Sequence, residues 1–225
     1  MAFRIASSLP LLALAALPAP AAAGDDTQLW TGAAATVKLG GRWRASQELV
    51  VRFSDRRDGL YEIESNTLIG YRFGRRTTFW AGYTHDPLYA GGHSIAIERR
   101  AREQLTVDGA KMGPGMLSLR LRLEERWRDG VAGTGWRLRP FARYSLPLGR
   151  GGSALVFSHE SFMNLNRTGF QSRGGEERMR NAIAVSVPLA KGLSAELGYL
   201  NQHGFVRGGA DTTDHVATLM LNLSL

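Results

Sequence analysis

The sequence contains no cysteine, which excludes disulfide bonds and metal sites built from thiolates. After the first 23 residues, no segment approaches the roughly 18 uninterrupted apolar residues of a membrane-spanning helix, so any crossing of a membrane must use strands. The five histidines are scattered, with no two at ligand spacing in one element. The glycine-rich stretches at 113–115 and 130–135 lack the Gly-Lys-Ser/Thr that completes a phosphate loop. We therefore expect neither a metal nor a cofactor.

The chain is basic, with a formal net charge of +8 at pH 7 that arginine largely supplies. A basic chain can bind nucleic acid, but these arginines alternate with apolar residues instead of clustering on a helix or a flexible arm. We therefore expect no nucleic-acid partner.

Residues 1–23 have the layout of a cleaved secretory signal peptide. They begin with a short basic segment around Arg4, continue with apolar residues at 11–17 and end on Ala21-Ala22-Ala23. The sequence predicts export, cleavage near Ala23 and one mature domain over 24–225.

The most informative stretch is 116–148, where apolar and charged residues alternate one for one along two arms. Leucines such as Leu119 and Leu121 share one face of the first arm, and arginines such as Arg120 and Arg122 share the other. This period of two indicates a β-hairpin. An apolar face toward lipid and a charged face toward a closed lumen are typical of outer-membrane barrels.

The same alternation predicts eleven strand-like runs: 29–39, 43–53, 61–73, 77–84, 95–107, the two arms of 116–148, 154–163, 179–187, 193–202 and 214–225. We expect an all-β fold, a single antiparallel transmembrane β-barrel of about 10–12 strands with short periplasmic turns and longer extracellular loops, such as 85–94. Single-chain bacterial barrels have an even number of strands, so either the first run is not a full wall strand or a twelfth lies in a loop.

The outer surface should contact outer-membrane lipid and lipopolysaccharide. Trp30, Trp43, Trp80, Trp127, Trp136 and Tyr144 fall mostly near predicted strand ends and are expected to form aromatic girdles. The leucine-rich last strand resembles the signal by which the barrel-insertion machinery recognises its clients, although it ends on Leu225 instead of an aromatic residue. The sequence does not define an oligomeric state.

The inward faces carry a ladder of charged residues, which we take as the candidate site. Its members are Arg44, Glu48, Arg52, Glu62, Glu64, Arg72, Glu98, Arg100, Arg102, Arg120, Arg122, Glu124, Arg126, Arg137, Arg139, Arg143, Glu160, Arg178, Arg180 and Glu196. The main hypothesis is a structural or weakly pore-forming lumen closed by arginine–glutamate pairs, because an unpaired buried charge costs several kcal/mol. An anion-preferring pore is the alternative, since arginine is in excess. A soluble periplasmic β-sheet protein that binds anions is a third possibility.

A hydrolase hypothesis depends on His159 and Ser161. Residues two apart on a strand share a face, and Glu177 on the returning strand could orient the imidazole. The pattern resembles the His-x-Ser element of outer-membrane lipid A deacylases, whose catalytic face is turned to the bilayer.

Short motifs along the mature chain carry a resemblance to a known family. They are Leu29-Trp30, LGGRWRASQELVVR at 39–52, Glu124-Glu125-Arg126-Trp127, Glu160-Ser161-Phe162-Met163-Asn164, Glu177-Arg178-Met179-Arg180-Asn181 and Glu196-Leu197-Gly198-Tyr199-Leu200-Asn201-Gln202. In this order and spacing the sequence resembles the DUF2490 family, outer-membrane-type β-barrel proteins of proteobacteria with no assigned function. The resemblance implies no enzyme activity and no catalytic residues, so it favours a non-enzymatic barrel over the deacylase hypothesis.

Overall fold

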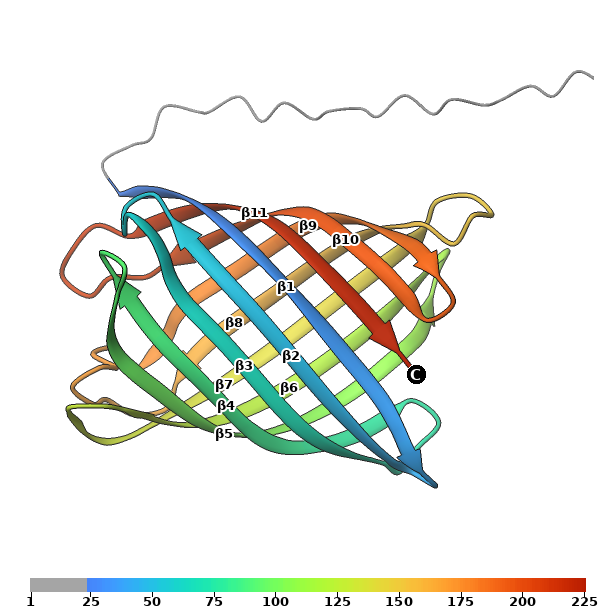
Figure 1. Ribbon diagram of the computed structural model, residues 1–225, viewed down its shortest axis with the longest axis horizontal. Helices are drawn as coiled ribbons and strands as arrows, with labels where there is room; N and C mark the ends of the chain where they lie inside the picture. The colour runs from blue at the N-terminus through green and yellow to red at the C-terminus, as the bar shows by residue number, and fades with distance from the viewer. Residues whose placement is uncertain (1–23) are drawn as a thin grey trace, which may run out of the picture.

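The computed structural model describes residues 24–225, which form eleven strands and no helix (Figure 1). The predicted signal peptide lies outside the described residues. The strands are β1 Asp25–Gly40, β2 Trp43–Ser54, β3 Gly59–Arg72, β4 Thr77–Ala90, β5 His93–Met112, β6 Gly115–Arg128, β7 Val131–Pro147, β8 Ala154–Asn164, β9 Gly175–Ala190, β10 Leu193–Gly204 and β11 Thr212–Ser224. Nowhere in 24–225 is there a helix long and apolar enough to cross a membrane.

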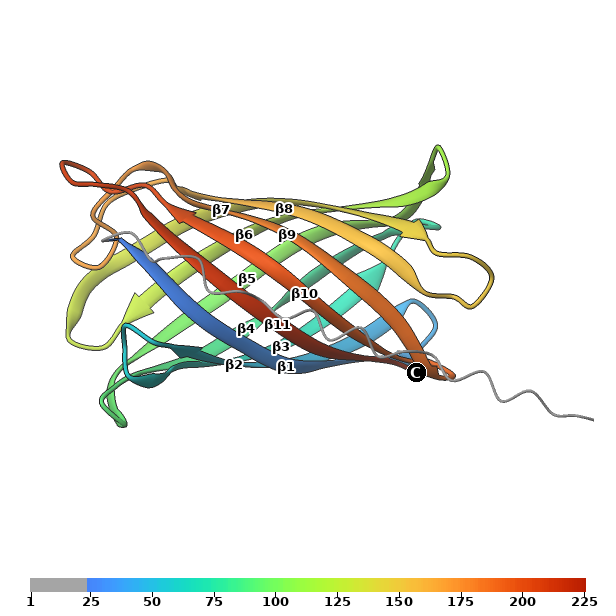
Figure 2. The ribbon, with the colours of Figure 1, turned by 90° about the horizontal axis from the view of Figure 1, so that it is seen from above.

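The strands close into one barrel in chain order, as predicted (Figures 1 and 2). Each strand pairs antiparallel with the next, and β1 closes the wall by pairing in parallel with β11, from Asp25↔Thr213 to Thr36↔Ser224. The eleven strands confirm the predicted number of about 10–12. They depart from the even number of single-chain bacterial barrels, because β1 is a full wall strand and the wall closes without a twelfth. An odd number of strands places the two termini at opposite ends of the barrel (Figure 1).

We call the two ends the loop end and the turn end. The loop end holds Asp25 and the connections 55–58, 91–92, 129–130, 165–174 and 205–211. The turn end holds Leu225 and the connections 41–42, 73–76, 113–114, 148–153 and 191–192. The expected loop at 85–94 is wrong, because β4 continues through Pro87 to Ala90 and only Gly91-Gly92 makes the turn.

Alternating burial within each strand follows the alternating sequence. In β6, Arg122, Glu124 and Arg126 are buried while Leu119 and Leu121 are exposed on the outer face. Every strand except β7 has at least one large apolar side chain exposed on the outside. The apolar stripes are thus not packed against protein, and the charged stripes fill the interior.

Three aromatic residues lie inside the barrel, contrary to the outward positions expected for them. A register shift between Arg52 and Phe53 changes the parity of β3, so Tyr61 is buried and its hydroxyl donates to Gln28 Oε1 at 2.7 Å. Trp30 and Trp80 are also buried inside and do not belong to an aromatic girdle. A count of alternating residues along one strand does not reveal a bulge, which explains why Tyr61 was predicted to face outward.

Apolar side chains fill part of the lumen between the charged residues. Trp30, Val50 and Val216 form a buried cluster, and Leu68 and Trp80 are also buried. The interior is therefore packed with side chains at this level.

Candidate functional site

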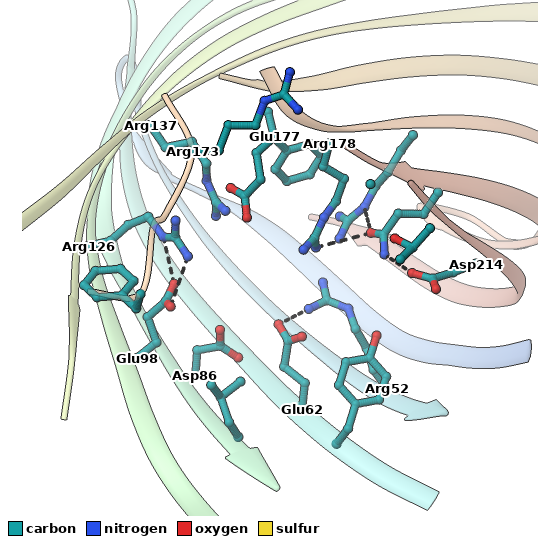
Figure 3. A pocket seen from close by; sticks show the side chains of 18 of the residues that line it. Arg52, Glu62, Asp86, Glu98, Arg126, Arg137, Arg173, Glu177, Arg178 and Asp214 are labelled. Carbon is teal, nitrogen blue, oxygen red and sulfur yellow. Dashed lines mark hydrogen bonds and ion pairs between the residues drawn. The ribbon is translucent and has the colours of Figure 1, made fainter. Parts of the chain in front are cut away.

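The loop end of the barrel encloses a cavity of about 590 Å³ (Figure 3). Residues of the connections 55–58, 165–174 and 205–211 line its mouth, and strand residues line its wall. Twelve arginines contribute: Arg52, Arg56, Arg57, Arg100, Arg126, Arg128, Arg137, Arg139, Arg173, Arg178, Arg180 and Arg207. Seven carboxylates oppose them: Asp26, Glu62, Glu64, Asp86, Glu98, Glu177 and Asp214. The cavity therefore has a formal excess of positive charge.

One wall of the cavity is a chain of ion pairs across β2, β3, β4 and β5. Glu64 Oε2 lies 3.0 Å from Nη2 of Arg52 and 3.4 Å from Nη1 of Arg100. Arg52 also contacts Glu62, and Arg100 contacts Asp86. Each carboxylate is thereby held by a guanidinium that is itself buried.

Glu98 gathers three arginines from β5 and β6. Its Oε1 accepts from Nε of Arg100 at 2.7 Å and from Nε of Arg126 at 2.9 Å. Its Oε2 accepts from Nη2 of Arg128 at 2.7 Å. Arg100 also pairs with Glu64 and Asp86, whereas Glu98 is the carboxylate that lies within 4 Å of Arg126 and Arg128 among the described residues.

Glu62, Glu64 and Asp86 bring carboxylate oxygens within 4.8 Å of one another, a donor set that could hold a cation. Arg52 and Arg100 already pair with these carboxylates. We therefore interpret this group as an ion-pair cluster and not as a metal centre.

Below the cavity, two fully or nearly buried glutamates close the middle of the lumen. Glu124 forms ion pairs with Nη2 of Arg137 and with Nη1 of Arg139, and each nitrogen lies 2.7 Å from a carboxylate oxygen. Glu160 forms an ion pair with Nη2 of Arg139 at 2.9 Å and also contacts Arg120. Glu124 has no exposed surface, so its ion pairs with Arg137 and Arg139 are shielded from solvent.

Aromatic rings provide several lumen arginines with a second type of partner, which the sequence did not reveal. Phe162 is buried, and its ring centroid lies 4.2 Å from the guanidinium of Arg139 and 4.5 Å from that of Arg180. Arg137 and Arg178 lie within 6 Å of the same ring. Since cation–π contacts stabilise desolvated guanidinium groups, Phe162 adds to the ion pairs of Arg137, Arg139 and Arg180 and supports Arg178, which makes no ion pair within 4 Å in 24–225. Phe162 follows Glu160 by two residues on β8 and therefore shares its inward face, so this spacing could have predicted the position of the ring.

The connection 165–174 folds over part of the cavity mouth. Gln171 is buried, accepts from Arg126 Nη1 at 2.8 Å and donates to the backbone oxygen of Asn166 at 2.9 Å. Phe170 lies 5.1 Å from the guanidinium of Arg128. These contacts fix the loop and leave its Arg173 at the mouth (Figure 3).

A second loop at the mouth, 205–211, is held by Asp211. The backbone N–H of Val206 donates to Asp211 Oδ1 at 2.9 Å, and His203 Nε2 lies 3.1 Å from Oδ2. The backbone hydrogen bond and the imidazole contact hold the pKa of Asp211 below its usual value. This loop contributes Arg207 to the cavity.

Five of the cavity arginines differ from the rest because they make no ion pair within 4 Å to any residue of 24–225: Arg56, Arg57, Arg173, Arg178 and Arg207. Neutral groups contact several of them. Arg178 donates to Gln202 Oε1 at 3.4 Å, and Arg57 lies over the ring of Tyr61 at 4.9 Å. These guanidinium groups are the ones that an anion entering from the loop end would meet.

The structure divides the predicted charge ladder among three levels. Arg52, Glu62, Glu64, Glu98, Arg100, Arg126, Arg137, Arg139, Arg178 and Arg180 line the cavity. Glu48, Arg102, Arg120, Arg122, Glu124 and Glu160 lie deeper and take part in buried or half-buried contacts. Toward the turn end, Arg143 pairs across the lumen with Glu196 at 2.9 Å, and Arg44 and Arg72 have buried Nε atoms.

His159 and Ser161 lie on the outer face, outside this cavity. The imidazole contacts Asn181 and not Glu177, so the orienting partner expected for the hydrolase hypothesis is wrong. A register shift between Phe162 and Met163 turns Glu177 toward the lumen, where it lines the cavity.

Comparison with known proteins agrees with the resemblance noted from the motifs. An uncharacterized protein of Methylorubrum extorquens is 27% identical over 164 residues, which cover 72% of this chain and 72% of that protein. No solved structure matches the chain. The sequence model of DUF2490, a family of proteins of unknown function, matches residues 27–213, and the chain therefore belongs to the DUF2490 family.

Proposed function

We propose that the protein is an outer-membrane barrel that does not conduct, and whose loop-end cavity binds a small anionic ligand. The observation that carries the binding proposal is the set of five cavity arginines that make no ion pair within 4 Å in 24–225. Phosphate and carboxylate groups match the planar fork of arginine, and desolvated walls strengthen such contacts.

The outer surface supports the membrane location. Large apolar residues are exposed on nearly every strand, for example Leu121 at 48% and Leu197 at 64%. Soluble proteins rarely expose contiguous apolar patches larger than a few hundred Å². A closed barrel with an apolar exterior and a charged interior instead matches a lipid environment.

The packed middle of the lumen argues against conduction. In an open pore the lining side chains would be solvated, whereas Arg102, Glu124 and Phe162 are each no more than 2% exposed. The cavity is therefore a blind vestibule, open only toward the loop end.

Binding is tested by calorimetry with inorganic pyrophosphate and the folded protein in detergent. The variant carrying Arg173→Gln, Arg178→Gln and Arg207→Gln is expected to bind at least tenfold more weakly than the unmodified protein. A matched variant with Arg42→Gln, Arg75→Gln and Arg150→Gln removes three exposed turn-end arginines and should bind normally. Equal weakening in both variants, or no binding by the unmodified protein, would contradict the proposal that the loop-end cavity binds an anion.

Two further measurements test the remaining parts of the proposal. Cell fractionation with heat-modifiable gel migration should find a folded barrel in the outer membrane, and recovery in the soluble periplasm would overturn the location. Planar bilayers containing the protein should show no channel steps. Anion-selective steps would instead support the alternative of a small pore.

A further inference from the structure

Three polar side chains on the outer face of β8 and β9 form one hydrogen-bonded chain. His159 Nδ1 lies 2.8 Å from Asn181 Oδ1, and His159 Nε2 lies 3.2 Å from Ser161 Oγ. Ser161 shares a face with His159 because it is two residues further along β8. Asn181 is the direct cross-strand partner of His159 in β9. The backbone ladder therefore sets the relative positions of all three residues.

The contacts also select one tautomer of the neutral imidazole. The amide oxygen of Asn181 can only accept, so Nδ1 of neutral His159 carries the proton. Nε2 then has a free lone pair that accepts the hydroxyl proton of Ser161. This is the tautomer in which histidine can act as a general base toward serine.

We propose that Ser161, His159 and Asn181 form a nucleophile, a base and an orienting group that hydrolyse acyl esters of lipids lying against the barrel. The lipid substrate rests on the membrane location proposed above. It departs from the expectation of a non-enzymatic barrel, and it replaces Glu177 of the hydrolase hypothesis with Asn181.

The surroundings of the three residues suit a lipid substrate. His159 and Asn181 are exposed, Ser161 is half-buried, and Phe157 and Ile183 are exposed on the next outward positions toward the turn end. Acyl chains can pack against such apolar residues while an ester group lies at the polar side chains. His159 is an ionisable residue on a face proposed to contact lipid, where ionisable side chains are costly.

Neighbouring residues on β7 leave the hydroxyl accessible. Ala142 faces His159, and the β7–β8 pairing then omits Arg139 and Pro140 before it resumes at Leu138↔Met163. Pro140 has no N–H to offer to β8, so the ladder is interrupted beside Ser161. Alanine and proline are small, so β7 does not cover the nucleophile.

A second polar cluster on the outer face provides an internal comparison. Gln47 donates to Ser65 Oγ at 3.0 Å and accepts from Thr67 at 2.5 Å. That cluster satisfies its hydroxyl groups without any base. The triad differs because an oriented imidazole lies between an acceptor and a hydroxyl.

The reaction would proceed in two steps. Ser161 Oγ attacks the ester carbonyl carbon and transfers its proton to His159 Nε2, which then protonates the leaving alkoxide as the ester C–O bond breaks. Water attacks the resulting acyl-serine, gives its proton to Nε2, and Ser161 leaves with that proton. The net reaction is an ester plus water giving a fatty acid and an alcohol, with no further reactant.

The nucleophile is tested with a fluorophosphonate probe on the folded protein in detergent, which does not depend on membrane location or on anion binding. The unmodified protein should be labelled, Ser161→Ala should not be labelled, and His159→Ala should be labelled at least tenfold more slowly. Ser65→Ala, which removes the comparison serine, should be labelled normally. Heat-modifiable migration checks that each variant is folded. Absence of labelling in the folded unmodified protein, or unchanged labelling of Ser161→Ala, overturns the triad.

Asn181 is a positioning residue, so its test uses a pH profile. Asn181→Leu should slow labelling of Ser161, whereas Asn181→Asp should be labelled at a rate close to that of the unmodified protein. In Asn181→Asp the pH at which labelling is half-maximal should move upward, because a carboxylate favours the protonated imidazole. Identical rates and pH profiles in all three proteins would overturn this role.

The substrate class is tested in two arms. One measures fatty acid release from phosphatidylethanolamine in mixed micelles, and the other measures the acylation of lipid A in cells that overproduce the protein. Loss of acyl groups in either arm, abolished by Ser161→Ala, supports the proposal and identifies the lipid. A labelled protein that cleaves neither lipid, or that fractionates as soluble, overturns the lipid substrate.

Discussion

The guanidinium of Arg139 lies 2.7 Å from Oε1 of Glu124 in the middle of the barrel, where Glu124 has no exposed surface. The same guanidinium donates from Nε to Oε1 of Glu160 at 3.1 Å, and its Nη2 lies 2.9 Å from that oxygen. Arg139 therefore joins the two glutamates that close the lumen, and the network spans β6, β7 and β8.

Replacing Glu124 with glutamine should strongly destabilise the barrel. The variant leaves Arg137 and Arg139 without one of their counter-charges in a desolvated site, and breaking a buried pair costs about 3–5 kcal/mol. Urea unfolding of the protein in detergent measures the loss. Glu103→Gln is the matched control, because Glu103 is exposed on the outer face, and its free energy of unfolding should barely change. Equal stability of the two variants would mean that the ion pairs do not support the lumen.

Gly70→Ala should also destabilise the protein, because a ring occupies the space above Gly70. A Cβ atom at this position would lie 2.4 Å from Cε3 of Trp80. Overpacking of this type costs about 1–3 kcal/mol. Gly151→Ala adds the same methyl group where nothing lies within 4 Å, and it should be neutral in the same unfolding measurement. Combining Gly70→Ala with Trp80→Leu should recover part of the lost free energy of unfolding. If nothing is recovered, the clash with Trp80 is not the cause of the destabilisation.

The sequence predicted the side-chain directions within β6 and β7 better than it predicted bulges and the register between strands. Alternation over β6 and β7 was sufficient to place Glu124 and Arg139 inside, because every pleat reverses the side-chain direction. The same rule failed at Tyr61, where a bulge adds one residue and reverses the parity. The partner of His159 was missed for a related reason. Register between strands is set by hydrogen bonds and bulges that no single strand encodes, so Asn181 could not be identified from spacing.

The sequence predicted a closed barrel, but it did not predict the parallel pairing of β1 with β11 that closes the wall. The runs at both termini read as ordinary strands, and nothing in either one specifies a parallel partner nearly 190 residues away. The seam depends on the shape of the complete wall, including Leu225, whose N–H donates to the backbone oxygen of Thr36 at 2.9 Å.

Cysteine pairs can test this seam cleanly, because the chain has no cysteine of its own. Ala33 and Leu221 are direct partners across the parallel pair, so Ala33→Cys with Leu221→Cys should form a disulfide on mild oxidation. Ala33→Cys with Leu225→Cys is the control, because four residues displace the second thiol by about 13 Å along the strand. Mass spectrometry of the digested protein measures both. Cross-linking in the control alone, or in neither variant, would show that β1 and β11 do not pair in this register.

The odd number of strands makes one further prediction about topology. Asp25 lies at the loop end, whereas the connection 148–153 lies at the turn end with Leu225. If the barrel spans the outer membrane as proposed, an epitope tag before Asp25 and a tag inserted at Gly151 must lie on opposite sides. Antibodies applied to intact cells should reach only one of them, and we expect the amino-terminal tag because its end carries the two longest connections, 165–174 and 205–211. A third tag at Gly209 should behave like the amino-terminal tag. If intact cells expose both the amino-terminal and Gly151 tags, or if permeabilised cells are needed to detect both, the barrel in the membrane has an even number of strands, and β1 does not cross it as a wall strand.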